Sequence, residues 1–321
     1  MKIALFGAGR IGKVHAIAIA GNTRAELACI VDPHGPSAAA LAEQYGVPVM
    51  AEEEALANPS IDGVLIGSST DQHARQIIAT ASAGKAIFCE KPIDLDITRV
   101  REVLAHLEAH PVPFMLGFNR RFDPNFMAMK AQIAAGAIGE VEMVTILSRD
   151  PDLPPIDYIK VSGGLFRDMM IHDFDMARFL VGEEFTDVTA RGAVLVNPEV
   201  GAAGDVDTAV ATLQTASGKL VSITNSRRAT YGYDQRIEVH GSKGMLQAEN
   251  VRESTVILST EAGIRLEKPM HFFLERYAQA YANEIEAFVR LVEDGDTSAP
   301  HAGDGLKALE LAEQALASSQ G

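Results

Sequence analysis

The sequence predicts two domains of different fold class. Residues 1–121 are expected to form a doubly wound α/β domain with a parallel sheet, because apolar runs there alternate with helical stretches of about 10–15 residues. Residues 122–321 are expected to form an α+β domain with an open, mostly antiparallel sheet, because period-two alternation and glycine turns dominate there. The length of 321 residues agrees with about two domains of ~150 residues each.

The composition narrows the class of partner. A formal net charge of −15 argues against nucleic acid and against an anionic membrane, since both are bound by clustered Lys and Arg. The apolar start of the chain is too short for a signal peptide, and no run of ~18 apolar residues follows it. Cys29 and Cys89 lie in apolar runs, where reduced core thiols are favoured over a disulfide. We therefore expect a cytoplasmic protein that acts on a small molecule.

The first element is a strand over residues 2–6 (KIALF), followed by a glycine-rich turn and a helical stretch. The turn reads Gly7-Ala8-Gly9-Arg10-Ile11-Gly12, which is a G-x-G-x-x-G pattern between a strand and a helix. Gly7 permits the tight turn, Gly9 allows a pyrophosphate to approach the backbone, and Gly12 allows close packing of helix and strand. The phosphates would lie at the positive end of the helix. The pattern predicts a Rossmann dinucleotide site, and a chance glycine loop is the alternative.

The second strand, residues 26–32 (ELACIVD), ends in Asp32, about 20 residues after the last glycine of the turn. An acidic side chain at this place accepts hydrogen bonds from the hydroxyls of the adenosine ribose and repels a 2′-phosphate. Pro33 and His34 follow, so no lysine or arginine is available there to hold that phosphate. The sequence therefore favours NAD over NADP.

The alternation of helices and strands continues to residue 119. The expected elements are helices over 35–46, around 52–59, over 71–84 and over 96–110, and strands over 61–69, 86–92 and 113–119. Ligands of such sheets bind at the carboxyl ends of the strands. The polar residues expected at those ends are Ser68, Ser69, Thr70, His73, Glu90, Lys91, Asn119, Arg120 and Arg121.

Lys91 follows a buried strand directly and precedes Pro92. The proline restricts the backbone of Lys91 to an extended conformation and allows a cis peptide bond, and both would fix the direction of the lysine side chain. A functional role is favoured over that of an ordinary surface lysine. His73 begins a helix, and it either caps that helix or contacts the nicotinamide ring.

The second half begins with a helix over residues 124–136. Strands are then expected within 141–150, 185–196, 207–229, 233–250 and 254–263, several of them joined by glycine-containing turns such as 217–219 (SGK) and 241–244 (GSKG). A long helix near 273–293 and a last helix near 303–318 that could pack on the first domain follow. A sheet with helices on one side leaves its other face open. A partner subunit is the expected cover, which makes the protein a homo-oligomer.

Residues 163–180 (GGLFRDMMIHDFDMARFL) are expected to form one apolar helix. Asp168, His172 and Asp175 are spaced so that they share one face of it. Burying three ionisable groups is costly without a purpose. A histidine with a carboxylate one turn away is a common general base. The alternatives are a buried helix whose polar groups satisfy one another and, less favoured, a zinc or iron site, which no further Cys or His cluster supports.

Three segments together resemble one known family. The glycine turn of residues 7–12, the Glu90-Lys91-Pro92 triplet and the helix over 163–173 are similar to those of the glucose–fructose oxidoreductase/inositol dehydrogenase/MocA (Gfo/Idh/MocA) family. The resemblance covers nearly the whole chain. Three segments look most like inositol 2-dehydrogenases within that family, namely 117–126, 168–175 and 226–245. The resemblance implies a Rossmann domain, a C-terminal domain with an open sheet and usually a tetramer.

Carried over residue by residue, the resemblance implies that Lys91, Asp168 and His172 are the catalytic group. His172 would take the hydroxyl proton, Asp168 would orient and polarise His172, and Lys91 would hydrogen-bond the reacting oxygen. Such acid–base help is typically worth ~10²–10⁴-fold in rate. The implied reaction is NAD-dependent oxidation of a ring hydroxyl of a cyclic polyol, with myo-inositol favoured. Scyllo-inositol, another inositol isomer, a pyranose sugar and a non-catalytic NAD sensor remain alternatives.

Further polar residues are candidates for contacts with the hydroxyls of a polyol. Besides the catalytic group they are Arg121, Asp150, Asp152, Asp175, Tyr231, Tyr233 and Gln235. A buried partner for each hydroxyl gives strong discrimination, since an analogue that lacks one hydroxyl leaves a polar group unpaired. Structural ion pairing is favoured for Arg120, Arg227 and Arg228. The sequence predicts no metal.

Overall fold

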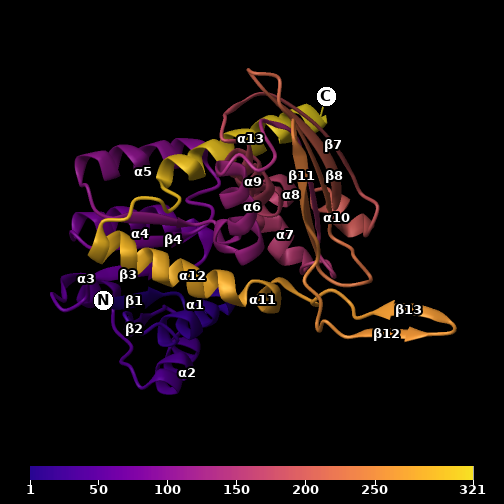
Figure 1. The fold of residues 1–321 in the computed structure, drawn as a ribbon. Coiled ribbons are helices and arrows are strands. Elements are labelled where there is room, and N and C mark those ends of the chain that lie inside the picture. The colour runs from indigo at the N-terminus through magenta and orange to yellow at the C-terminus, as the bar shows by residue number, and fades with distance from the viewer. Residues whose placement is uncertain (321) are drawn as a thin grey trace. The chain divides into compact units, whose positions relative to one another are not determined.

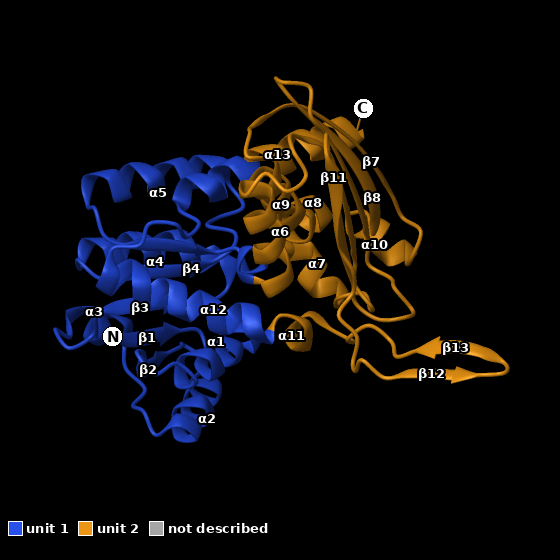
Figure 2. Cartoon of the chain, viewed as in Figure 1, with its two compact units in different colours: residues 1–122, 278–309 blue, residues 123–277, 310–321 orange. Residues whose placement is uncertain are grey.

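The computed structural model describes residues 1–320, which form two compact units (Figure 2). The first unit contains Met1–Phe122 together with Ala278–Leu309. The second contains Asp123–Tyr277 and the chain from Glu310 onward. A segment near the end of the sequence therefore completes the N-terminal unit. Among residues 1–320, no helix combines the length and the apolar character that crossing a membrane requires.

The first unit is built on a five-stranded parallel sheet with the order β2-β1-β3-β4-β5, which confirms the predicted doubly wound fold. All residues of β3 and β4 are buried, as expected for parallel strands covered on both faces. The strands are β1 (Lys2–Phe6), β2 (Glu26–Val31), β3 (Gly63–Ile66), β4 (Ala86–Glu90) and β5 (Phe114–Gly117).

Helices flank this sheet, and one of them comes from the far end of the sequence (Figure 1). Helix α12 (Ala278–Val289) packs beside α1 (Arg10–Ala20), and its Phe288 ring meets that of Phe88 edge-on at 5.8 Å between centroids. The other helices of this unit are α2 (Gly35–Tyr45), α3 (Glu52–Ala57), α4 (Thr70–Ser82), α5 (Ile97–Ala109), the 3₁₀ helix η1 (Asn119–Phe122) and the π-helix η2 (Arg290–Asp294).

The second unit contains a six-stranded sheet with the order β11-β10-β6-β9-β8-β7. Its pairs are antiparallel except for the central pair β6–β9, so the sheet is mixed but mostly antiparallel, as predicted. Burial alternates strictly along β8, the mark of a sheet covered on one face. The strands are β6 (Val141–Arg149), β7 (Phe185–Ala193), β8 (Thr208–Thr215), β9 (Leu220–Ser226), β10 (Asp234–Gly241) and β11 (Gly244–Ala248).

The helices of the second unit differ from the prediction in one important place. The stretch 163–180 is not one helix, because α8 (Gly164–Asp168) and α9 (Met170–Val181) are separated at Met169. Helix α9 packs on β6 and β9 and on α6 (Pro124–Ala134). Two short helices were not predicted, α7 (Ile156–Ser162) and α10 (Pro198–Ala202).

The C-terminal segments also divide more finely than the sequence suggested. The long helix expected near 273–293 is interrupted at Tyr277, which leaves α11 (Phe273–Arg276) separate from α12. The last helix, α13 (Ala302–Gln320), forms as expected.

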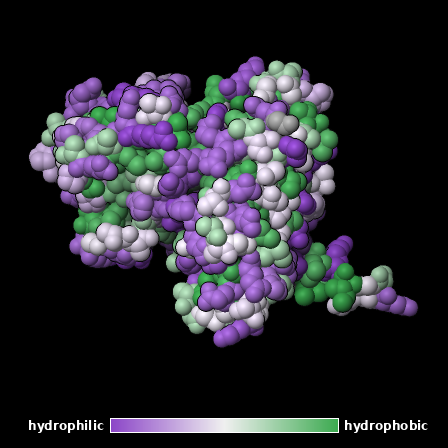
Figure 3. Space-filling view, turned by 90° about the horizontal axis from the view of Figure 1, so that it is seen from above, coloured by the Kyte–Doolittle hydropathy of each residue, from purple (hydrophilic) through white to green (hydrophobic). Residues whose placement is uncertain are grey.

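The strand expected over 254–263 does not join the large sheet. It belongs to a separate hairpin of β12 (Ile257–Thr260) and β13 (Gly263–Leu266), whose residues are all exposed. Apolar side chains such as Ile257 and Ile264 lie on this projecting hairpin, which shows as a green segment at the right of Figure 3.

Candidate active site

The glycine turn after β1 has the shape that a pyrophosphate needs. Gly7 has a φ of +102°, and a Cβ there would lie 2.4 Å from the carbonyl oxygen of Gly67. A Cβ on Gly12 would lie 2.0 Å from the carbonyl oxygen of Gly7, so only glycine fits both places. A Cβ on Gly9, by contrast, would meet nothing within 4 Å. Open space therefore lies in front of the N-terminus of α1, where a phosphate can approach the backbone.

Asp32 lies beside this turn, directly after β2. Its Oδ2 accepts a hydrogen bond from the backbone N–H of Ala8 at 2.6 Å, and its Oδ1 accepts one from that of His34 at 2.7 Å. Each carboxylate oxygen can accept a further hydrogen bond. The carboxylate is thus held in place with acceptor capacity left for the two ribose hydroxyls, which fits the cofactor predicted for Asp32.

The loop after β3 holds Ser68, Ser69 and Thr70. Ser68 donates a hydrogen bond to Gln76 Oε1 at 2.6 Å, while Ser69 is the N-cap residue of α4 and Thr70 is its first residue. His73 is buried, and its ring nitrogens lie 2.7 Å from the carbonyl oxygen of Pro92 and 3.1 Å from that of Ser68. His73 therefore joins the loop after β3 to the segment after β4, and its contact with nicotinamide stays a prediction.

The Glu90-Lys91-Pro92 triplet ends β4, and the peptide bond between Lys91 and Pro92 is cis. The side chain of Glu90 is buried, and its Oε1 lies 2.6 Å from His15 Nε2 on α1. The backbone N–H of Lys91 donates to the other carboxylate oxygen of Glu90 at 3.3 Å. The predicted cofactor residue Glu90 thus faces the core beside His15, and Lys91 next to it is partly exposed.

A third ionisable side chain joins this pair. Glu284 on α12 is fully buried, and its ligand atoms lie within 4.8 Å of those of His15 and Glu90. Within residues 1–320, neither carboxyl oxygen of Glu284 has a hydrogen-bond partner. Burial, with the nearby charge of Glu90, raises the pKa of Glu284 well above its ordinary value. The 2.6 Å between His15 Nε2 and Glu90 Oε1 is the distance of a short hydrogen bond.

Two arginines follow β5 in the first unit. Arg121 lies 3.1 Å from Asp304 in an ion pair whose two side chains are mostly buried. Arg120 is buried as well. The ion pair predicted for Arg120 and the substrate contact predicted for Arg121 both stay predictions.

In the second unit, the backbone conformation explains why glycines occupy the first two positions of the stretch 163–180. Gly163 and Gly164 have φ angles of +87° and +80°, which other residues rarely adopt. A Cβ on Gly164 would lie 2.7 Å from the carboxylate of Asp205. That carboxylate accepts the N–H of Leu165 at 3.0 Å and so satisfies the start of α8.

Asp168 is the last residue of α8, and both of its carboxylate oxygens have partners. Tyr158 donates to Oδ1 at 2.9 Å, and Nη2 of Arg227 donates to Oδ2 at 3.3 Å. The side chain of Arg227 is only 2% exposed. The structural ion pair expected for Arg227 therefore exists, and its partner is one of the predicted catalytic residues.

His172 lies in the first turn of α9, four positions after Asp168 but in the next helix. The adjacent Asp173 is fully buried and anchors α9 to the sheet. Its carboxylate accepts hydrogen bonds from Ser148 Oγ on β6 and from Asn225 Nδ2 on β9, each at 2.8 Å. The backbone that carries His172 is thereby fixed to two strands. The sequence analysis missed this anchor, although polar residues at buried strand positions are a signal for it.

Three predicted substrate residues lie in the core of the second unit. Gln235 is fully buried and donates to the carbonyl oxygen of Leu147 at 3.2 Å, and its Oε1 lies 2.8 Å from Ser148 Oγ. Tyr233 is buried against Tyr277, and Asp175 is buried on α9. Their contacts with substrate stay predictions, and for Gln235 the visible role is to support Ser148.

The remaining substrate candidates lie nearer the surface. Asp150 donates its backbone N–H to the carbonyl oxygen of Ser226 at 3.0 Å, and the side chain of Asp152 is largely exposed, 3.7 Å from His271. Tyr231 donates to Asp234 at 2.5 Å and accepts from Arg149 at 3.1 Å.

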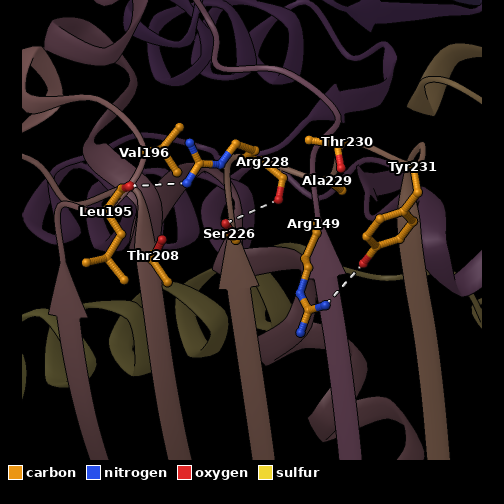
Figure 4. A pocket seen from close by; sticks show the side chains of 9 residues that line it. All are labelled: Arg149, Leu195, Val196, Thr208, Ser226, Arg228, Ala229, Thr230 and Tyr231. Carbon is orange, nitrogen blue, oxygen red and sulfur yellow. Dashed lines mark hydrogen bonds between the residues drawn. The ribbon is translucent and has the colours of Figure 1, made fainter.

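Tyr231 also lines a surface pocket of about 340 Å³, together with residues of β6, β8 and β9 and of the loops beside them (Figure 4). Arg149 points toward the Tyr231 hydroxyl, and Arg228 donates to the carbonyl oxygen of Leu195 at 3.3 Å. The pocket therefore contains Tyr231 but none of the predicted catalytic residues.

Comparison with known proteins gives matches in both units. Residues 1–118 match the family described as an oxidoreductase family with an NAD-binding Rossmann fold, and residues 126–247 match the GFO/IDH/MocA C-terminal domain. The chain is 56% identical to an inositol 2-dehydrogenase of Rhizobium meliloti over 99% of its own length and 96% of the relative's.

Two solved structures show how far the similarity extends in three dimensions. The crystal structure of a myo-inositol dehydrogenase from Corynebacterium glutamicum is 46% identical, with a TM-score of 0.96 over 100% of this chain and 96% of that one. The scyllo-inositol dehydrogenase of Lactobacillus casei, with bound NAD(H) and scyllo-inositol, is 31% identical, with a TM-score of 0.92 over 100% of this chain and 97% of that one.

Proposed function

This chain belongs to the Gfo/Idh/MocA oxidoreductase family and is an NAD-binding oxidoreductase, and we propose that it oxidises a ring hydroxyl of a cyclic polyol. The favoured substrate is myo-inositol, and the product is then 2-keto-myo-inositol (scyllo-inosose). The observation that carries the proposal is the end-to-end match to an inositol 2-dehydrogenase. The glycine turn and Asp32 support it, since their shape and hydrogen bonding fit NAD.

In this proposal His172 is the general base that takes the proton of the reacting hydroxyl. Lys91 hydrogen-bonds the same oxygen and favours its alkoxide-like form. NAD, when bound, would supply the hydride acceptor, and the protein would orient the reacting carbon toward it. The residues that would hold the cofactor are those of the turn Gly7–Gly12, with Arg10 and Ile11 within it, together with Asp32 and the loop Ser68–Thr70.

Asp168 is proposed to orient His172 and to stabilise the imidazolium that forms. An ionised carboxylate does this best, because it accepts hydrogen bonds and carries the compensating charge. The bonds from Tyr158 and Arg227 support the assignment, since they hold the carboxylate in one position.

The substrate test is the initial rate of NADH formation, followed by absorbance, with NAD and each of myo-inositol, scyllo-inositol and D-glucose, and repeated with NADP. We expect NAD to be preferred and myo-inositol to give the highest kcat/KM. A preference for scyllo-inositol, which the Lactobacillus casei relative binds, would keep the mechanism and change the substrate. A preference for glucose would point to a sugar dehydrogenase. Binding of NAD without turnover of any polyol would favour the sensor alternative.

We also propose that the protein is a homo-oligomer, with a tetramer expected from the family resemblance. The second unit supports this, because its sheet and its hairpin expose large apolar side chains at several positions. These are Met143, Val210, Leu220, Met245, Val256, Ile257, Leu258, Ile264 and Leu266. Sedimentation equilibrium tests the proposal, and a monomer at micromolar concentration would refute it.

The cytoplasm is the proposed compartment. Cys29 and Cys89 are free thiols buried in β2 and β4, and such thiols persist in a reducing environment. Cell fractionation with a marker for each compartment tests this assignment, and recovery outside the cytoplasm would overturn it.

A further inference from the structure

Arg227 is an arginine buried inside the second unit. It follows β9, its backbone N–H donates to the carbonyl oxygen of Asp207 at 2.8 Å, and its side chain is 2% exposed. A guanidinium taken out of water is strongly unfavourable unless an anion compensates its charge. The anion at hydrogen-bond distance is Asp168, with 3.3 Å between Nη2 and Oδ2. The neighbouring Arg228 is different, since its exposed side chain bonds only a backbone carbonyl in the described part of the chain.

A second carboxylate lies near the same guanidinium. Asp205 is mostly buried, and burial raises its pKa, with the charge of Asp168 acting in the same direction. The backbone N–H groups of Leu165 and Val206 and the charge of Arg227 oppose that rise. One buried cation therefore serves two carboxylates that repel each other. Removal of that cation would raise the pKa of Asp205 further, because the charge of Arg227 opposes the effects of burial and of Asp168.

The other ionisable groups around Asp168 come from the elements packed on α8. Tyr158 of α7 donates to Asp168 Oδ1 at 2.9 Å, and His172 lies in the first turn of α9. Arg167, the residue before Asp168, is paired with Glu313 of α13 at 2.5 Å. Arg227 therefore contacts Asp168 directly, while Glu313 compensates the charge of Arg167.

We infer that Arg227 is a positioning residue that keeps Asp168 ionised and holds its carboxylate where His172 needs it. The inference rests on the proposed function, because it assigns Arg227 a part in the acid–base step. A protonated Asp168 would be a hydrogen-bond donor at one oxygen and could not stabilise a charged imidazole. Arg227 contacts Asp168 rather than the substrate, so its effect is on rate and pH dependence and not on the affinity for NAD.

The test compares the pH dependence of kcat for the full-length protein and its variants, with NAD and myo-inositol. In Arg227→Met we expect kcat at neutral pH to fall by about 10²-fold and the acid limb of the profile to move to higher pH by about one unit or more. The NAD dissociation constant should not change. Arg227→Lys keeps the charge, so it should recover most of the pH profile with a lower kcat. Arg228→Met is the matched control and should leave the profile unchanged.

A folded Arg227→Met protein with an unshifted acid limb would overturn the inference and show a purely structural ion pair. A second readout does not depend on activity or on the folding of Arg227→Met. In wild-type protein labelled with ¹³C at the aspartate carboxyls, the Asp168 signal is identified by its loss in Asp168→Asn. We expect that signal to remain that of a carboxylate throughout the pH range in which the wild-type protein is active. Titration of Asp168 near neutrality would contradict the inference, whereas absence of polyol turnover in the wild type would refute only the proposed function.

Discussion

His15 Nε2 on helix α1 lies 2.6 Å from Glu90 Oε1 at the end of strand β4. This contact joins the helix that faces the pyrophosphate position to the residue just before Lys91. Glu284 of α12 completes the cluster from a distant part of the sequence. Two acids and one imidazole buried together must share protons, since the core does not tolerate two unpaired carboxylates. The cluster gives the first prediction.

The stability of Glu284→Gln relative to that of the wild type should increase as pH rises. The folded-state pKa of Glu284 is raised above its unfolded value, so the stability it contributes is present at low pH and is lost as pH rises through the folded pKa. Glutamine has no proton to lose. Between the unfolded-state pKa and the higher folded-state pKa, the stability of the wild type should fall relative to that of the variant by about 1.4 kcal/mol for each pH unit.

Urea unfolding at about pH 6 and pH 9 measures this difference. Glu286→Gln is the matched control, because Glu286 lies on the same helix, is partly exposed and bonds Asn22 and Arg24. Wild type and Glu284→Gln losing the same stability between the two pH values would show that Glu284 is not held protonated.

Replacement by alanine should affect two glycines of the turn differently, with Gly9→Ala weakening NAD binding and Gly12→Ala lowering the stability of the fold. Gly9→Ala places a methyl group in open space, so stability should change by only a few tenths of a kcal/mol while NAD affinity falls at least about 10-fold. Gly12→Ala drives a methyl group into the carbonyl of Gly7, which should lower stability by about 1–3 kcal/mol. Thermal unfolding with and without NAD separates the two effects. Equal loss of stability in both variants would mean that the space before α1 is not the phosphate site.

Asp32→Ala should weaken NAD binding and reduce the preference for NAD over NADP. The change removes the acceptor for the ribose hydroxyls and the charge that repels a 2′-phosphate. It also removes the hydrogen bonds to Ala8 and His34, so part of the loss should be common to both cofactors. The ratio of kcat/KM for NAD and NADP is therefore the informative quantity. Glu26→Ala on the exposed start of β2 is the control, and an unchanged ratio in Asp32→Ala would refute the role of Asp32.

Asp173→Asn should lower kcat without changing NAD affinity. The buried carboxylate accepts one hydrogen bond from β6 and one from β9, and an amide can accept only at its oxygen. We expect a loss of about 1–3 kcal/mol in stability and a smaller kcat, since α9 carries His172. Asp187→Asn on β7, at an exposed side chain, is the control. Wild-type kcat in a destabilised Asp173→Asn would show that the anchor has no part in placing His172.

Local patterns in the sequence were sufficient for much of the fold and for the identity of the cofactor. The glycine turn, Asp32 and the alternating helices and strands are each defined by residues close together in the chain. The interruption at Met169 was not predicted because the helical pattern of apolar residues continues on both sides of it. The need for glycine at position 164 was not predicted either, because the side chain that would clash there belongs to Asp205, some distance along the sequence.

The contacts that hold the candidate site residues in place could not be predicted from the sequence, for a related reason. His15, Glu90 and Glu284 meet only because α12 returns to α1, and Arg227 meets Asp168 only because β9 ends beside α8. Hydrophobic periodicity predicts which face of an element is buried, but not which polar group of a distant element will lie against it. The hairpin of β12 and β13 was assigned to the large sheet because its alternation of apolar and polar residues is that of any strand.

The central claim is that His172 is the base of an NAD-dependent inositol dehydrogenase. Its most direct test is the initial rate of NADH formation with saturating NAD and myo-inositol, compared between wild type and His172→Ala. We predict turnover by the wild type and a loss of at least about 10²-fold in kcat for the variant, with NAD binding unchanged. An equal rate in the two proteins would remove His172 from the mechanism.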